Sequence, residues 1–272
     1  MSTVISYLNL IDTATVNVFD NGDNVPGVPG SGANLQNPNR NSKWVGPVVP
    51  VSGGANGIAY EWDDSVDLSV VALLDHDAVL TNPADFVLQN RNAALSWSNL
   101  ADSLGVVWED DEAARHGVWY LPTPLESTGI RMLWNTNAST GETISASRLW
   151  AGPAIDLSGS VTTHTENTEL IDPSTQSYGR QLTRDGRTRQ LKRTVTELGD
   201  IPTATAWGDE TDSVNCLDSM GAAVGRSGDV LLIPDTTTAA NRRRGFVYGT
   251  LTQDLKLQGL RPRRATIAIR EL

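Results

Sequence analysis

Carboxylates beside tryptophan are the groups in this sequence that come nearest to catalytic chemistry. Residues 60–64 read YEWDD, and residues 108–112 read WEDDE. Two carboxylates about 5 to 10 Å apart are the arrangement that glycoside hydrolases use. Runs of charge are, however, usually solvated faces, and a sequence alone shows neither a cleft nor a raised pKa. We therefore interpret both runs as surface, and we expect that the protein is not an enzyme.

Other reactive side chains are sparse. The three histidines, His76, His116 and His164, lack the spacing of a metal site. His76 lies between two aspartates, which could orient an imidazole, but a hydrogen-bonded histidine at a strand end is the favoured interpretation. Cys216 is the only cysteine, which excludes an internal disulfide and every multi-cysteine zinc site. The sequence predicts no catalytic residue, no cofactor and no metal site.

Eight tryptophans are a high count for a chain with 6% aromatic residues. An indole ring buries a large area, and it can also stack on the face of a sugar. For any single tryptophan, packing in a core or interface is the favoured role. We single out Trp62 and Trp108, which stand beside the acidic runs, as candidates for glycan contact.

A basic segment interrupts an otherwise acidic chain. The net charge is -11, yet residues 177–272 carry 15 basic and 11 acidic side chains, whereas residues 1–176 carry 6 and 21. Such asymmetry fits docking between oppositely charged faces of two copies, or binding to nucleic acid. A nucleic-acid-binding domain would have a pI above about 9 and aromatics among its basic residues. Because residues 177–198 contain one aromatic, Tyr178, we expect no specific nucleic-acid binding.

The basic segment reads SYGRQLTRDGRTRQLKRTVTEL. Asp185 and Gly186 stand between two alternating flanks and predict the turn of a long hairpin, because a type I′ turn needs positive φ at both central residues. Neither face of that hairpin is apolar enough for a core. We hypothesise that its basic side chains form a subunit interface; the candidates are Arg184, Arg187, Arg189, Lys192 and Arg193.

The elements that must position these candidates are mostly strands. The continuous apolar run at 67–74 is typical of a strand in a sandwich core. Residues 129–134 and 145–157 predict a hairpin with a long tip. The final segment, ATIAIREL, alternates cleanly, so we expect a strand that closes a sheet with Ile267 and Ile269 facing inward.

Helices are expected to be few and short. Residues 98–104 and 109–116 each end at a glycine and are predicted as helices. A helix is also predicted from about Ser213 to Val224, with Gly225 just past its end. Its expected apolar stripe consists of Cys216, Leu217, Met220, Ala223 and Val224. Residues 20–41 are rich in Gly, Pro and Asn and are predicted as a flexible arm.

Composition and length set the general class. The 272 residues are 39% hydrophobic with a mean hydropathy of -0.25, which is typical of a globular chain with a packed core. The sequence begins without a basic segment followed by an apolar run, and it has no apolar run near the roughly 18 residues of a membrane span. We expect a soluble protein that is made in the cytoplasm and does not bind membranes.

Several segments resemble proteins of bacteriophage tails. The strand in SRLWAGPAIDL, preceded by VDLSVVALLDHDAVLTNPADFVL, is similar to minor tail proteins of long-tailed phages, whose N-terminal half is a discoidin-like or galactose-binding-like jelly roll. The order of the basic segment, a helix, DVLLIPD, FVYGTLTQDLKL and ATIAIREL resembles the second half of such proteins, including distal tail proteins.

The resemblance implies an all-β fold, with a jelly-roll β-sandwich followed by a second β-rich region that has a long hairpin and one short helix. We accordingly predict three parts. Residues 1–43 form N-terminal strands and a flexible arm, residues 44–160 form the galactose-binding-like sandwich, and residues 161–272 form a β-rich assembly domain that carries the basic hairpin.

The resemblance also implies a role. It predicts a structural virion protein of the tail tip, in the distal tail or baseplate, present in the host cytoplasm during assembly. Its partners would be further copies in a homo-oligomeric ring, the tail tube and the hub. A ring interface is heterologous, so the basic hairpin of one copy would face acidic groups of the next. The alternative is a carbohydrate-binding adhesion module that contacts a glycan on the host surface, since such folds serve many roles.

Overall fold

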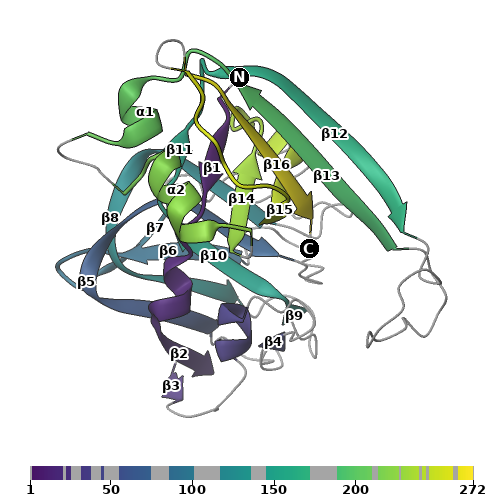
Figure 1. Ribbon diagram of the computed structural model, residues 1–272. Helices are drawn as coiled ribbons and strands as arrows, with labels where there is room; N and C mark the ends of the chain where they lie inside the picture. The colour runs from purple at the N-terminus through teal and green to yellow at the C-terminus, as the bar shows by residue number, and fades with distance from the viewer. Residues whose placement is uncertain are drawn as a thin grey trace. The chain divides into compact units, whose positions relative to one another are not determined.

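The structure is a computed structural model, and it divides into two compact units. Unit 1 comprises residues 1–7, 155–235 and 246–272, and unit 2 comprises residues 8–154 and 236–245. The structure describes residues 2–20, 23–25, 32–37, 44–45, 55–74, 86–100, 117–135, 145–171, 189–209, 214–226, 228–238, 241–242, 245–259 and 263–271. Within these residues each unit holds a seven-stranded antiparallel sheet, so the predicted all-β fold is confirmed (Figure 1). The division into residues 1–43, 44–160 and 161–272 stays a prediction.

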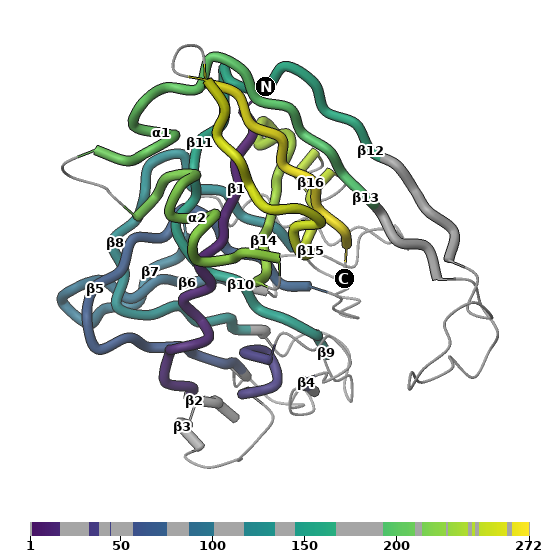
Figure 2. Tube along the Cα trace, in the orientation of Figure 1, coloured from purple at the N-terminus to yellow at the C-terminus, as the bar shows by residue number. Residues whose placement is uncertain are grey.

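The sheet of unit 1 brings together distant parts of the chain. Its strands, in spatial order, are β11 (Ile155–Asp156), β1 (Val4–Ser6), β14 (Asp229–Ile233), β15 (Val247–Leu251), β16 (Ala265–Glu271), β13 (Arg189–Leu198) and β12 (Val161–Ile171). The N-terminal strand β1 pairs with β11 on one side and with β14 on the other (Figure 2). Ile5 has no exposed surface, because it lies in a strand flanked by neighbours on both sides.

For unit 1, the predicted closing strand is confirmed and the predicted hairpin is not. β16 lies between β15 and β13, and Ile267 and Ile269 are buried, as expected for a strand that closes a sheet. β13 pairs with β12, from Val161 opposite Leu198 to Ile171 opposite Arg189. The predicted hairpin within residues 177–198 is therefore wrong, because a two-residue turn at Asp185 and Gly186 would place Tyr178 opposite Arg193, where Asn167 stands. The predicted turn at Asp185 and Gly186 lies outside the described residues.

Unit 1 also contains two helices in its described part, where one was predicted. α1 is Thr203–Trp207 and α2 is Leu217–Val224. α2 ends at Gly225 as predicted, but it begins four residues later than Ser213, since the Cys216 sulfur caps it by accepting a bond from the Ser219 amide. Ala223 is exposed rather than part of the apolar stripe. At 100° per residue it falls about 120° away from Leu217, outside the buried face.

Unit 2 is built on two very long strands. Its sheet has the order β3 (Asp23–Val25), β2 (Thr15–Asp20), β5 (Ala55–Leu74), β8 (Gly117–Asn135), β6 (Phe86–Arg91) and β7 (Trp97–Asn99), and β10 (Arg148–Gly152) also pairs with β5. β4 (Trp44–Val45) and β9 (Ser145–Ala146) form a small second sheet. The core under these strands includes Leu35, Trp44, Tyr60, Trp119 and Met132. Among the described residues, no helix is long and apolar enough to cross a membrane.

Three sequence-based predictions of local structure in unit 2 are wrong. The predicted hairpin between residues 129–134 and 145–157 does not form, because β8 pairs with β5 and β6 while β10 pairs with β5. Residues 97–99 are strand β7 and not the start of a helix, while residues 101–116 lie outside the described part. The predicted arm 20–41 contains strand β3 and the 3-10 helix η2 (Gly32–Gln36).

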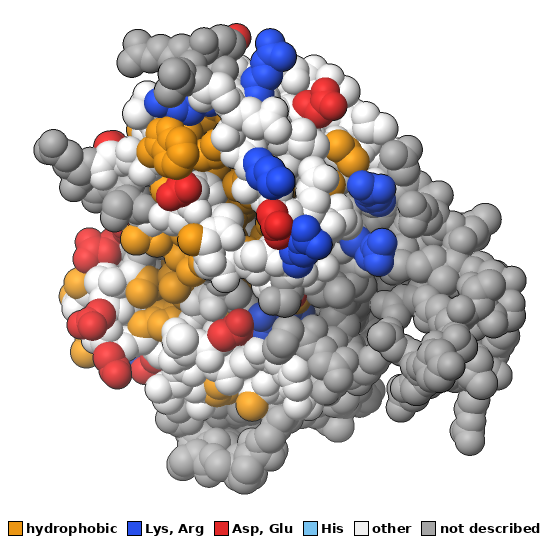
Figure 3. Space-filling model, viewed as in Figure 1, with side chains coloured by type: hydrophobic (Ala, Val, Ile, Leu, Met, Phe, Trp, Pro, Cys, Tyr) orange, Lys and Arg blue, Asp and Glu red, His pale blue; other side chains and the backbone are white. Residues whose placement is uncertain are grey.

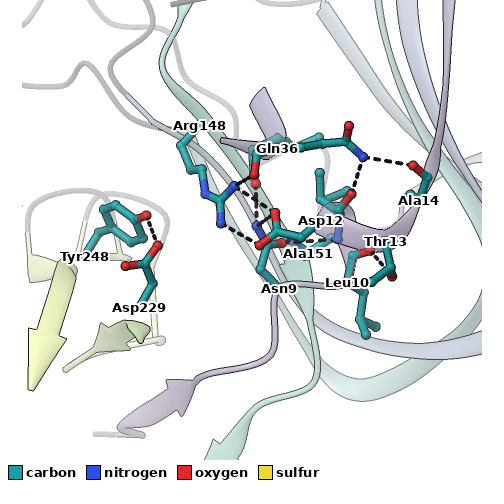
Figure 4. A network of polar contacts seen from close by, with 12 residues as sticks. Asn9, Leu10, Asp12, Thr13, Ala14, Gln36, Arg148, Ala151, Asp229 and Tyr248 are labelled. Atoms are coloured by element: carbon teal, nitrogen blue, oxygen red, sulfur yellow. Dashed lines mark hydrogen bonds and ion pairs between the residues drawn. The ribbon is translucent and has the colours of Figure 1, made fainter. Parts of the chain in front are cut away.

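An ion pair between an exposed carboxylate and a buried guanidinium joins the start of unit 2 to β10 (Figure 4). The 3-10 helix η1 (Leu10–Thr13) carries Asp12, whose two carboxylate oxygens accept from Nη1 and Nη2 of Arg148 at 2.7 and 2.8 Å. Arg148 is 1% exposed, and its Nη1 also donates to the Gln36 carbonyl. Asn9 accepts from the Ala151 amide at 3.0 Å. These bonds connect η1, η2 and β10 through side chains.

Candidate functional site

A row of polar and aromatic side chains crosses the sheet of unit 2 on the face opposite its core. Strand pairing places Glu61 opposite Gly129, Gly129 opposite Arg91, and Arg91 opposite Trp97. Residues directly opposite each other in a sheet project from the same face. Tyr60, Asn90 and Ile130, which are next to them on β5, β6 and β8, project to the other face and are buried.

A second row lies two residues along the same strands. Arg131 stands opposite Gln89, and Gln89 stands opposite Asn99. Because side chains alternate along a strand, this row shares the face of the first. We call the six side chains Glu61, Gln89, Arg91, Trp97, Asn99 and Arg131 the Trp97 surface.

A glycine lets the indole lie across the sheet. A Cβ at Gly129 would stand 3.3 Å from Cη2 of Trp97 and 3.0 Å from the Tyr60 carbonyl oxygen. The far edge of the indole therefore reaches over β8 from β7, crossing β6. The Trp97 ring remains half-buried, so part of it is open to solvent.

Two guanidinium groups lie beside the indole. The Cζ of Arg131 is 4.4 Å from the ring centroid of Trp97, and the Cζ of Arg91 is 5.9 Å from it. Both distances are within the range of cation–π attraction, which contributes about 0.5 to 2 kcal/mol depending on solvent exposure. The arginines therefore hold the indole in place.

Hydrogen bonds order the polar side chains of the surface. Arg91 Nη1 donates to Glu61 Oε2 at 2.6 Å, and Arg131 Nε donates to Gln89 Oε1 at 2.6 Å. Gln89 Nε2 in turn donates to Asn99 Oδ1 at 2.7 Å. These bonds fix the amide and guanidinium planes. Because the side chains are already ordered, a ligand would lose less binding free energy to side-chain ordering.

Unused donors remain on this surface. Within the described part of the chain, the Trp97 Nε1 and both Nη groups of Arg131 donate no hydrogen bond to protein. Burial lowers the pKa of Arg131, and among the described residues no carboxylate forms an ion pair with it to offset that cost. An aromatic ring, planar amides and free donors on a rigid sheet are groups that could bind a polar ring such as a sugar.

The tryptophans singled out from the sequence are not part of this surface as described. Trp62 is half-buried, packs against the core of unit 2, and donates from Nε1 to the Leu10 carbonyl at 2.8 Å. Trp108 lies outside the described residues. Trp97 is one of the eight tryptophans, but the sequence offers no reason to select it as a candidate for glycan contact. Arg91 and Arg131 were not candidates either, because only strand pairing brings them next to Trp97.

The predicted interface residues are placed only in part. Arg184 and Arg187 lie outside the described residues. Arg189, Lys192 and Arg193 belong to β13, and of these three only the side chain of Arg193 is described, as half-buried. Their role at an interface stays a prediction.

Unit 1 has a depression of about 640 Å³ at the end of β13. Its lining includes the exposed ion pair Arg226–Asp254, together with Glu197, Asp200 and Lys256. Asp200 has a φ of 54°, an uncommon conformation for a non-glycine residue. The charges of the lining are mixed, so they indicate no particular ligand. No group of acidic, histidine or cysteine side chains suited to a metal ion occurs among the residues that the structure describes.

Comparison with known proteins gives weak similarity to solved structures. No family model matches the sequence, and no curated protein matches it. The chain is similar to a chitosan-binding module of a Paenibacillus chitosanase/glucanase, with 11% identity over 54% of this chain and 98% of that chain, and a TM-score of 0.40.

Two further similarities are of the same strength. A family 32 carbohydrate-binding module of Streptococcus pneumoniae EndoD shows 16% identity over 53% of this chain and 98% of that chain, with a TM-score of 0.36. A fucolectin from striped bass (Morone saxatilis) serum shows 10% identity over 97% of this chain and 93% of that chain, with a TM-score of 0.35. At these identities and TM-scores, the similarities assign neither a family nor a function to the chain.

Proposed function

We propose that the protein binds carbohydrate through the Trp97 surface. The observation that carries this proposal is the Trp97 indole, which lies across Gly129 beside two guanidinium groups with donors to spare. The apolar C–H face of a sugar ring packs on an indole, while its hydroxyl groups pair with arginine and amide side chains. The Trp97 surface supplies both kinds of contact on one rigid sheet.

This function corresponds to an adhesion role rather than catalysis. The carboxylate of the surface, Glu61, is 2.6 Å from Arg91 and is therefore held as a structural anion. Adhesion to a glycan on a host surface would need only contact between the glycan and the Trp97 surface, without a reaction. The proposal thus favours the carbohydrate-binding alternative over hydrolysis.

Glycan binding is testable with a matched pair of tryptophan variants. Trp97→Ala should weaken binding to a glycan by at least about tenfold, because it removes the stacking surface. Trp207→Ala is the control, since Trp207 is also exposed and also lies beside an arginine, 6.0 Å from Arg263, but belongs to unit 1. Affinity electrophoresis and glycan-array screening would measure the effect.

Two results would refute the proposal. One is the absence of binding to every glycan tested with the folded protein. The other is an equal loss in the Trp97→Ala and Trp207→Ala proteins, which would indicate general loss of structure.

We infer a second candidate function, assembly into a ring, from like charges that face each other across strands. In unit 2, Asp67 stands directly opposite Glu126, with Asp63 and Asp64 close by and exposed. We call these four side chains the acidic ridge; red side chains gather in Figure 3 where β5 and β8 are labelled in Figure 1. In unit 1, Arg193 stands directly opposite Arg270.

Opposed like charges are destabilising unless something neutralises them. None of the acidic ridge, Arg193 or Arg270 has an ion-pair partner among the described residues. Complementary charges on a second copy would provide one, and such complementarity mainly favours correct encounter. These charges support self-association. A tail-tip protein of a virion, with the tail tube and hub as further partners, is the role that we propose such self-association would serve.

A further inference from the structure

The charges on the Trp97 surface do not balance. The surface carries two guanidinium groups and one carboxylate, and that carboxylate, Glu61, is already paired with Arg91. Arg131 is left as a cation whose described polar contacts are the neutral Gln89 side chain and the Trp97 ring. A half-buried cation without an anion is costly, and burial accordingly lowers its pKa.

The free atoms of Arg131 form a fork. Its Nε is used by Gln89, while Nη1 and Nη2 donate to no protein group in the described part of the chain. Two parallel guanidinium donors match the two oxygens of a carboxylate better than they match separate hydroxyl groups. Because Gln89 and the indole hold the guanidinium plane, the fork is oriented before a ligand arrives.

The fork is also adjacent to the stacking ring. With Arg131 Cζ 4.4 Å from the centre of the Trp97 indole, one sugar residue could contact the ring and present a substituent to the guanidinium. Neutral glycans would satisfy the ring but leave the cation uncompensated. A glycan that carries a carboxylate would satisfy both.

Resting on the carbohydrate-binding function proposed above, we propose that the Trp97 surface selects acidic sugars, with Arg131 binding the sugar carboxylate and Trp97 stacking on its ring. The ligand class is a glycan built from carboxylated sugars, such as a uronic acid. Arg131 is then the residue that determines specificity, and Trp97 is the residue that provides affinity for sugars in general.

The test compares an acidic and a neutral glycan, with four variants of the full chain. Oligogalacturonate is the acidic probe, and an oligogalactoside of equal length is the neutral probe. Arg131→Gln should weaken binding to oligogalacturonate by about 10- to 100-fold, the usual loss for a hydrogen-bonded charge, and leave the neutral probe within about twofold. Arg131→Lys keeps the charge but removes the fork, so it should lose most of the same affinity.

Controls separate the specific contact from general attraction. Arg226→Gln removes an exposed cation of unit 1 and should leave both affinities unchanged. Trp97→Ala should weaken both probes. Thermal unfolding of each variant, followed by circular dichroism, confirms that the fold is retained, and calorimetry at physiological salt limits non-specific attraction.

The outcomes distinguish this inference from the proposed function. Equal binding of both probes, unchanged by Arg131→Gln, overturns acidic selectivity but leaves carbohydrate binding intact. An equal loss of affinity for oligogalacturonate in Arg131→Gln and Arg226→Gln also overturns acidic selectivity through Arg131, because the attraction would then be non-specific. Stronger binding of a sulfated oligosaccharide, used as a third probe, than of oligogalacturonate overturns the carboxylate assignment. Binding to neither oligogalacturonate nor the oligogalactoside overturns acidic selectivity, whereas absence of binding to every glycan of the array refutes the proposed function itself.

Discussion

At the scale of single residues, the clearest feature is the guanidinium of Arg148, which is buried and paired with a carboxylate that is partly open to solvent. The side chain of Asp12 is 40% exposed, whereas that of Arg148 is 2% exposed. Burial raises the pKa of Asp12, although the hydrogen bond and charge of Arg148 act in the opposite direction. Removing Asp12 and removing Arg148 should therefore change the free energy of unfolding by different amounts.

Replacing Asp12 alone should lower the free energy of unfolding more than replacing both Asp12 and Arg148. Asp12→Ala removes a carboxylate that pairs with both Nη atoms of a buried guanidinium, so we expect a loss of about 3 kcal/mol or more in the free energy of unfolding. The double variant Asp12→Ala/Arg148→Met leaves no buried charge and should be more stable than Asp12→Ala alone. Urea unfolding measures both, and Asp63→Ala, an exposed carboxylate, is the control with a change within about 0.5 kcal/mol. A double variant that is less stable than Asp12→Ala would contradict this account.

The ion pair in unit 1 predicts a pH effect of known sign. The hydrogen bond from Arg226, and then its charge, lower the pKa of Asp254. A carboxyl whose pKa is lower in the folded state stabilises the fold at pH values above its unfolded pKa, and this contribution disappears as the pH falls through the folded pKa. Carboxyl NMR titration should show the Asp254 pKa rising in Arg226→Gln, and rising less in Lys256→Gln, whose charge is a weaker cause. An equal rise in both variants would contradict this.

At the scale of elements, close packing of backbones limits which glycines can be replaced. Gly249 in β15 has the backbone of β16 directly against it, and a Cβ there would lie 2.0 Å from the Arg270 carbonyl oxygen. Gly221 in α2 differs, since a Cβ there would meet Leu255 at an ordinary 3.5 Å. The same substitution should therefore have opposite effects at the two positions.

Gly249→Ala should destabilise the protein by about 3 kcal/mol or more, because β15 and β16 must separate to admit the methyl group. Gly221→Ala should stabilise it by up to about 1 kcal/mol, since alanine favours a helix interior more than glycine does. Thermal unfolding of the two variants tests the contrast. A Gly249→Ala protein as stable as the unchanged chain would show that the two strands do not lie this close.

For the molecule as a whole, the proposed self-assembly is based on opposed like charges within each unit. The acidic ridge lies in unit 2, and the pair Arg193 and Arg270 lies in unit 1. A heterologous interface between such surfaces can repeat from copy to copy and close into a ring. The net charge is -15 for residues 1–176, which contain the acidic ridge, and +4 for residues 177–272, which contain Arg193 and Arg270.

Charge reversal tests assembly directly. Asp67→Arg/Glu126→Arg and Arg193→Glu/Arg270→Glu should each abolish self-association, because each variant then carries the same charge on both surfaces. Mixing the two proteins should restore association, with the two variants alternating along the assembly. Sedimentation velocity at several concentrations measures this, and association should weaken as salt rises because exposed charges are screened. Arg226→Glu is the control outside the proposed contact. A chain that stays monomeric at high concentration and low salt would refute self-assembly through these surfaces.

The sequence by itself determined the β-rich class, the closing strand with Ile267 and Ile269, and the end of α2 at Gly225, because alternation, apolar runs and glycine act over a few neighbouring residues. Only the tertiary structure decided that β1 lies between β11 and β14, that Asp12 meets Arg148, and that Arg131 lies beside Trp97. Local patterns say which residues share a face of a strand, but they do not say which strands become neighbours. That choice depends on packing between segments far apart in the chain, and the Trp97 surface exists only after it is made.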